Sequence, residues 1–107
     1  MQTITADELA RWRADPARRK PALLDVREPW EVAICRLDGA LEIPMREVPA
    51  AIDRLDTEAP LVCVCHHGAR SLQVAQFLEA RGVRDVYNLT GGIDAWSRLV
   101  DPALPRY

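Results

Sequence analysis

The stretch Cys65-His-His-Gly-Ala-Arg70-Ser71 decides how the chain is interpreted, because it joins two segments of different hydrophobic period. The run Pro60-Leu-Val-Cys-Val64 has the apolar, β-branched content of a short buried strand, and residues 71–81 have the spacing of an amphipathic helix. Cys65 is therefore expected at a strand-to-helix turn. Because a helix N-terminus presents unpaired N–H groups and a partial positive charge, this position favours a thiolate and an anionic ligand. The sequence predicts a reactive cysteine here.

Strands and helices alternate along the rest of the chain. Strands are predicted at residues 22–26, 39–43, 61–65 and 85–89, and helices at about 6–14, 28–32, 46–55, 71–81 and 91–98. This order implies an α/β fold in which a parallel central sheet is flanked by helices on both faces. Ligands gather outside the carboxyl ends of such strands, so Asp25, Cys65 and the Thr90-Gly91-Gly92 turn are expected to share one rim.

Length and composition describe an ordinary globular chain. Its 107 residues are enough for one hydrophobic core, so we expect a single domain over residues 1–107. The net charge is −2, and the only small basic group, at Arg13 and residues 18–20, gives no support for nucleic-acid binding. The polar N-terminus lacks the apolar segment of a signal peptide or a membrane span, so a cytoplasmic protein without membrane association is expected.

Three cysteines are present, at spacings that do not suggest a disulfide framework, so reduced thiols are expected. Cys63 lies inside a predicted strand, which favours a core position. His66 and His67 follow Cys65 directly, but a strand and a tight loop do not easily wrap adjacent ligands around one tetrahedral ion, and no second ligand pair follows. We therefore expect no metal and no cofactor.

Four separated motifs resemble the signatures of the rhodanese family in its single-domain form. They are Leu24-Asp-Val-Arg-Glu-Pro-Trp-Glu31, Gly39-Ala-Leu-Glu-Ile-Pro44, the Cys65–Ser71 loop and Leu89-Thr-Gly-Gly-Ile-Asp-Ala-Trp96. One such motif is a weak signal, but four in order at the family's spacing are specific, and the likeness covers nearly the whole chain. The resemblance implies a rhodanese-like α/β domain.

The resemblance also implies sulfurtransferase chemistry. Cys65 takes a sulfane sulfur from a small donor such as thiosulfate or a persulfide, carries it as its own persulfide, and passes it to a thiol or another nucleophile. The loop wraps the sulfur, and the substrate-binding residues that the resemblance implies are His66, His67, Gly68, Ala69, Arg70 and Ser71. Backbone N–H groups of this loop suit a persulfide anion, because a glycine lets the loop curl.

The polar residues near the loop each have two interpretations. The planar fork of Arg70 suits a sulfonate or an acidic acceptor, or the residue is a surface arginine. Ser71 caps the helix or hydrogen-bonds the sulfur, and the two histidines contact substrate or lie solvated in the loop. Asp25 and Arg27, with Glu28 and Glu31 near, form an ion-pair network that fixes the rim loops, or they contact substrate directly.

Two other function classes remain open. A cysteine phosphatase or arsenate reductase also uses a cysteine-to-arginine loop at a helix N-terminus, but four residues separate Cys65 from Arg70, one fewer than in phosphatases of this design. The shorter loop narrows the cradle for a tetrahedral anion. A regulatory binding module is the second alternative, although inactive relatives commonly lose the cysteine that this chain keeps.

Two segments extend the comparison with the family. Cys35-Arg36 stands where the family usually has glycine and histidine, and Cys35 either resolves the Cys65 persulfide as a disulfide or has no redox role. The tail Val100–Tyr107 is similar to the end of rhodanese domains appended to enzymes that activate ubiquitin-like sulfur carriers. A sulfur-carrier protein or a desulfurase is therefore an expected partner, and a proline-limited strap packed on the domain is the alternative.

Overall fold

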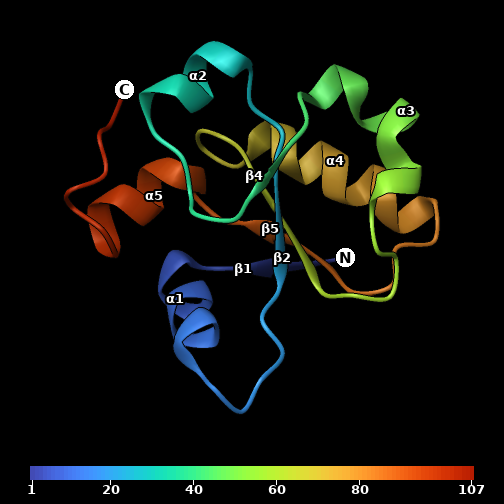
Figure 1. Ribbon diagram of the computed structural model, residues 1–107, viewed down its shortest axis with the longest axis horizontal. Coiled ribbons are helices and arrows are strands. Elements are labelled where there is room, and N and C mark those ends of the chain that lie inside the picture. Colours follow the sequence, from blue (N-terminus) through green and yellow to red (C-terminus); the bar gives the residue numbers. More distant parts are fainter.

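A five-stranded parallel sheet is the centre of the computed structural model, which describes residues 1–107 (Figure 1). The strands lie in the order β1-β5-β4-β2-β3, and every pair of neighbours is parallel. Their bounds are Gln2–Ile4 (β1), Ala22–Asp25 (β2), Leu41–Glu42 (β3), Leu61–Val64 (β4) and Val86–Leu89 (β5). The predicted fold class is confirmed.

Helices cover both faces of the sheet. Their bounds are Ala6–Ala14 (α1), Pro29–Ile34 (α2), Val48–Ala51 (α3), Ala69–Ala80 (α4) and Gly92–Leu99 (α5), with short 3-10 turns at Met45–Glu47 (η1) and Ile52–Arg54 (η2). Helices α1 and α5 pack against one face, and α3 and α4 against the other (Figure 1). None of these helices has both the length and the apolar character needed to cross a membrane.

The strands are apolar on both faces because both faces are covered. Side chains alternate along β4, so Val62 and Val64 enter the core under α1 and α5, whereas Leu61 and Cys63 enter the core under α3 and α4. All four of these residues are buried. This double burial accounts for the uninterrupted apolar run that precedes the loop, and it fixes Cys65 at the carboxyl end of a central strand.

Local predictions differ from the structure in several places, and the strand expected over residues 39–43 is shortened to Leu41–Glu42. The strand β1 was not predicted, because it is a three-residue edge strand in which only Ile4 is buried. The helix expected over residues 46–55 is broken into η1, α3 and η2, since Pro49 has no N–H to continue a helical ladder from the preceding turn. Helix α4 begins at Ala69 rather than at residue 71, so Arg70 already lies inside the helix.

The start of α5 holds the Cys65 loop in place. The Ile93 N–H donates to the Cys65 carbonyl over 2.9 Å, and the Asp94 N–H donates to the His66 carbonyl over 3.1 Å. Gly92, with a φ of +60°, leaves no room for a side chain, because a Cβ there meets both loop carbonyl oxygens at 2.4 Å. Cys65 and the Gly91-Gly92 turn were predicted to share one rim. In the structure they do so through contacts between their backbones.

We expect Gly92→Ala to destabilise the protein far more than Gly39→Ala. Both glycines have positive φ, which costs an alanine about 1–2 kcal/mol, but a Cβ on Gly39 has nothing within 4 Å. Because the loop carbonyls cannot move without losing their hydrogen bonds, Gly92→Ala should cost roughly 3 kcal/mol or more. Urea unfolding of the two variants measures the difference, and equal midpoints contradict the close approach.

Candidate active site

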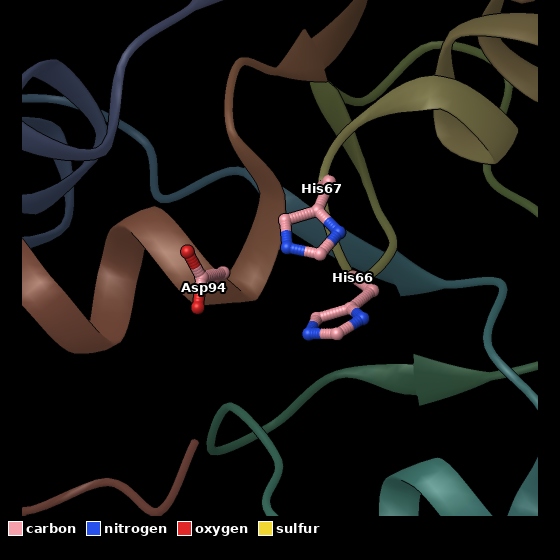
Figure 2. A group of neighbouring side chains, drawn as sticks. All are labelled: His66, His67 and Asp94. Atoms are coloured by element: carbon pink, nitrogen blue, oxygen red, sulfur yellow. The ribbon is translucent and has the colours of Figure 1, made fainter. Parts of the chain in front are cut away.

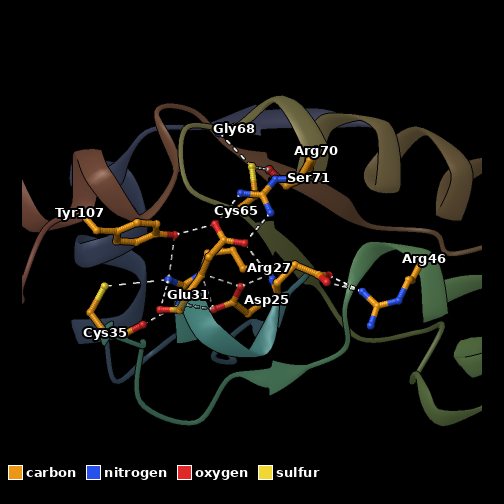
Figure 3. A network of polar contacts seen from close by, with 11 residues as sticks. Asp25, Arg27, Glu31, Cys35, Arg46, Cys65, Gly68, Arg70, Ser71 and Tyr107 are labelled. Carbon is orange, nitrogen blue, oxygen red and sulfur yellow. Dashed lines mark hydrogen bonds and ion pairs between the residues drawn. The ribbon is translucent and has the colours of Figure 1, made fainter. Parts of the chain in front are cut away.

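The Cys65 sulfur lies beneath its own loop, with Cys65 only 1% exposed. The Gly68 N–H donates to Sγ over 3.0 Å, and Ser71 Oγ lies 3.3 Å from the same sulfur (Figure 3). Gly68 is the N-cap of α4 and takes a φ of +106°, which turns the loop back toward the cysteine. The sulfur therefore faces the positive end of α4 and two hydrogen-bond donors, an arrangement that stabilises negative charge on sulfur.

Ser71 hydrogen-bonds the sulfur rather than capping the helix. The cap position belongs to Gly68, while Ser71 lies one turn further on and is fully buried. Its single hydroxyl proton is shared between Cys65 Sγ and Asn88 Oδ1, which lies 2.5 Å away. The hydroxyl can therefore donate to a thiolate, or accept from a thiol while it donates to the amide.

Asn88 is a site residue that the sequence analysis missed. It lies in β5, where its neighbours are apolar, and its side chain reaches the loop instead of water. Its Nδ2 donates to the Gly68 carbonyl over 3.1 Å, and its Oδ1 accepts from Ser71. A polar amide inside a buried strand was the signal that could have pointed to it, because a buried polar group needs partners.

Asp25 and Arg27 form a buried ion pair beneath the rim. Arg27 Nη2 lies 2.7 Å from Asp25 Oδ2, and each residue is 1% exposed. Arg27 also donates to the carbonyls of Glu31 over 3.2 Å and Cys35 over 2.7 Å. Although burial opposes it, the hydrogen bond with Asp25 raises the pKa of Arg27. Of the two interpretations the geometry favours rim support, because neither side chain is exposed to substrate.

Arg70 is paired with Glu31 of α2. The guanidinium makes a two-pronged contact with the carboxylate, with Nη1 at 2.7 Å from Oε2 and Nη2 at 2.8 Å from Oε1. The hydrogen bonds from Arg70 lower the pKa of Glu31 to about 2 against the opposing effect of burial. The same contact raises the pKa of Arg70. One interpretation of the sequence was that Arg70 binds a substrate anion. In the structure its guanidinium is instead paired with the Glu31 carboxylate (Figure 3).

Tyr107 reaches into this network from the far end of the chain. Its hydroxyl donates to Glu31 Oε1 over 2.9 Å and accepts from Arg27 Nη1 over 3.1 Å. Its ring stacks on His66, with the centroids 3.8 Å apart and the planes 11° from parallel. The exposed Trp30 makes a T-shaped contact with the same ring, with the centroids 6.0 Å apart. Burial raises the pKa of Tyr107 to about 12, so the hydroxyl stays protonated as a donor. The tail packs as a strap, and its residue Tyr107 was not predicted as part of the site.

His66, His67 and Asp94 are the nearest approach to a metal site (Figure 2). One ligand atom of each lies within 4.8 Å of the others. The two imidazole rings are tilted by 31° with centroids 3.8 Å apart, and both Asp94 oxygens accept hydrogen bonds from arginines, Arg98 and Arg106. The two arginines compete with any ion for the Asp94 carboxylate oxygens.

The two histidines differ in their surroundings. His66 is half-buried between His67 and Tyr107, and its Nε2 is buried without a hydrogen-bond partner. Burial, followed by the neighbouring His67, lowers the pKa of His66, which keeps its imidazole neutral near pH 7. His67 and Ala69 are exposed at the loop surface. Contact of either histidine with a substrate stays a prediction.

The other two cysteines lie in separate places. Cys63 is buried within β4, and burial raises the pKa of its thiol to about 12, so it stays protonated. Cys35 is buried behind Arg27, whose Nη1 lies 3.9 Å from its Sγ. Cys35 packs in the core under α1 and α5, whereas Cys65 packs in the opposite core. This placement favours a non-redox role for Cys35.

An open groove runs beside Arg70. It encloses about 470 Å³ and is lined by Val26, Glu28, Met45, Arg46, Pro49 and Arg70. Arg46, which is exposed, is ion-paired with Glu28, another lining residue of the groove. Apolar side chains and ion-paired side chains therefore both line the surface beside Arg70.

Comparison with known proteins decides the family. A profile of the Rhodanese-like domain matches residues 5–99. The chain belongs to the rhodanese family. Among rhodanese relatives, "Thiosulfate sulfurtransferase GlpE" of Pseudomonas aeruginosa is 34% identical over 95% of this chain and 88% of its own length. "Rhodanese-like/PpiC domain-containing protein 12, chloroplastic" of Arabidopsis thaliana is 39% identical, and the chain spans only 38% of that protein.

Solved rhodanese structures have the same fold. A crystal structure of a rhodanese-like domain protein from Staphylococcus aureus matches with a TM-score of 0.84 and 32% identity, over 100% of this chain and 99% of that one. A structure from Staphylococcus saprophyticus matches with a TM-score of 0.85 and 32% identity, over 99% and 100% of the two chains. The resemblance noted in the sequence is confirmed.

The Glu31 carboxylate should make stability depend on pH in the acid range. Its pKa is about 2 in the folded protein and about 4.3 in an unfolded chain, so its charge stabilises the fold above about pH 4.3 and this contribution is lost as the pH falls toward 2. We expect wild type to exceed Glu31→Gln in stability at pH 7, by a margin that shrinks between about pH 5 and 2. Urea unfolding at stepped pH measures it.

Glu58→Gln is the matched control for that titration. Glu58 is exposed and pairs with the exposed Arg84, so the same chemical change there should leave the acid profile close to wild type. A margin between wild type and Glu31→Gln that stays constant from pH 7 to pH 3 contradicts the linkage.

Proposed function

We propose that this rhodanese is a sulfurtransferase that carries sulfur as a persulfide on Cys65. The relatives named as thiosulfate sulfurtransferase and as sulfurtransferase support the reaction class. The observation that carries the mechanism is the environment of Sγ, which receives the Gly68 N–H and lies beside the Ser71 hydroxyl at the N-terminus of α4. Donors in these positions stabilise a thiolate before reaction and a persulfide anion after it.

The reaction divides into two displacements on sulfur. In the first, the Cys65 thiolate attacks the outer sulfur of thiosulfate, the S–S bond of the donor breaks, and sulfite leaves with the electron pair. In the second, a nucleophile such as a thiolate or cyanide attacks the outer sulfur of the persulfide, and the Cys65 thiolate is released. Charge is conserved in both steps, and no cofactor or metal is needed.

The loop residues take the roles that the family resemblance assigns. The backbone of His66, His67, Gly68 and Ala69 curls around the sulfur, with the curve held by the start of α5. Asp25 and Arg27 support the rim from below. We take residues 1–107 as one rhodanese domain, acting on a small sulfur donor with a sulfur-carrier protein or a desulfurase as partner. The three free thiols favour a reducing compartment such as the cytoplasm.

The competing functions are less well supported by the site. Phosphatase or arsenate reductase chemistry needs a cradle for a tetrahedral anion, whereas the four-residue loop closes its Gly68 N–H directly on sulfur. A binding module without catalysis does not require the contacts that the Cys65 sulfur makes with the Gly68 N–H and the Ser71 hydroxyl.

The test is sulfur transfer from thiosulfate to cyanide. We expect the purified protein to release sulfite and form thiocyanate, and Cys65→Ala to abolish both products because no other thiol can carry the sulfur. Cys35→Ala and Cys63→Ala are matched controls that remove a buried thiol without touching Sγ of Cys65, and both should retain the activity. Activity in Cys65→Ala equal to wild type rules out the proposal.

A further inference from the structure

Arg70 is the residue of the loop best suited to bind an anion, and its guanidinium is already occupied. Both of its terminal nitrogens donate to the Glu31 carboxylate, at 2.7 and 2.8 Å, in the geometry that a sulfonate or carboxylate ligand would adopt. The other two arginines drawn around the site are also paired, Arg27 with Asp25 and Arg46 with Glu28 (Figure 3). A donor that approaches Cys65 past these residues meets balanced charge.

Glu31 is held in this position by more than Arg70. Its Oε2 accepts the Glu28 N–H over 2.9 Å, and its Oε1 accepts the Tyr107 hydroxyl over 2.9 Å. The Tyr107 hydroxyl is fixed in turn by Arg27. The Glu31 side chain is 4% exposed, against 35% for Arg70, so the carboxylate belongs to the protein interior and the guanidinium faces outward. A substrate anion that is to make the same two-pronged contact with Arg70 therefore has to displace a fully bonded carboxylate.

We propose that Glu31, clamped by Tyr107, is a specificity-determining residue that selects against dianionic sulfur donors and favours donors with a single negative charge. The inference rests on the proposed sulfurtransferase function and names its substrate class. A dianion such as thiosulfate gains little from Arg70, because Glu31 neutralises the guanidinium charge and occupies both of its terminal nitrogens. A monoanionic donor, which would gain only half as much from an unpaired arginine, loses less.

Two sulfur donors that react in the same way but carry different charges allow the effect of donor charge to be measured. Thiosulfate delivers its outer sulfur to the Cys65 thiolate and releases sulfite, a dianion. Methanethiosulfonate, a monoanion, delivers its outer sulfur to the same thiolate and releases methanesulfinate, a monoanion. In each case one S–S bond forms and one S–S bond breaks, with the electron pair leaving on the sulfur oxyanion. The ratio of kcat/KM for thiosulfate to kcat/KM for methanethiosulfonate therefore measures charge selectivity.

We expect Glu31→Gln to raise that ratio about fivefold or more, with a fall in KM for thiosulfate, because the freed Arg70 charge acts most strongly on the dianion. Glu31→Asp keeps the negative charge and should keep the ratio low. Glu58→Gln, which removes a carboxylate from the distant exposed pair with Arg84, should leave the ratio unchanged. A ratio in Glu31→Gln equal to or below wild type overturns the proposal.

Tyr107→Phe tests the hydrogen bond from Tyr107 to Glu31 with little change in packing. It removes the hydroxyl that donates to Glu31 and keeps the ring that stacks on His66. We expect a rise in the same ratio that is smaller than the rise in Glu31→Gln. A ratio identical to wild type in Tyr107→Phe removes the tyrosine from the proposal.

A second readout does not need turnover. Iodoacetate and iodoacetamide alkylate a thiolate in the same way but differ by one negative charge, so the ratio of their rates at Cys65, followed by peptide mass spectrometry, reports the local field. We expect Glu31→Gln to raise this ratio several-fold, and an unchanged ratio overturns the inference. If wild type and all variants fail to use either sulfur donor, the proposed function fails, and the alkylation ratio still decides the role of Glu31.

Discussion

The buried ion pair between Asp25 and Arg27 is the interaction on which the site depends. A buried guanidinium has five N–H donors to satisfy, and Arg27 satisfies them on Asp25, on backbone carbonyls of α2 and its C-terminal end, and on the Tyr107 hydroxyl. In doing so it ties the end of β2, the helix α2 and the tail to one point. Removing one partner of such a pair leaves an uncompensated charge, at a cost of about 3–5 kcal/mol.

The loop itself is held between two helix N-termini. Helix α4 supplies the Gly68 N–H to the sulfur, while the first N–H groups of α5 bind the carbonyls of Cys65 and His66 from behind. A peptide group whose carbonyl is bound on one side points its N–H to the other. The two helices therefore orient the peptide dipoles of the loop together. Glycine at position 92 is what allows α5 to come this close to the loop, because a side chain there would meet the loop carbonyls.

Much of this arrangement follows from local sequence pattern. The periods of two and 3.6 residues located four strands and the helices, and the parallel topology brought Asp25, Cys65 and the double glycine to one rim. The pairing of Arg70 with Glu31 spans 39 residues, and that of Tyr107 with Glu31 spans 76. Such contacts depend on side-chain directions after folding, which no hydrophobic period encodes. For Asn88 the polar amide inside an apolar strand marked the residue, but its partners Gly68 and Ser71 became visible only in the fold.

Trp30 gives this site an optical property. It is 64% exposed and meets the Tyr107 ring edge to face, whereas Trp12 and Trp96 are buried at 4% and 8%. A soluble quencher such as iodide therefore reaches one indole in preference to the other two. The quenchable part of the intrinsic fluorescence therefore comes mainly from the indole that lies against Tyr107, so the surroundings of this tail residue can be followed in the native protein without a label.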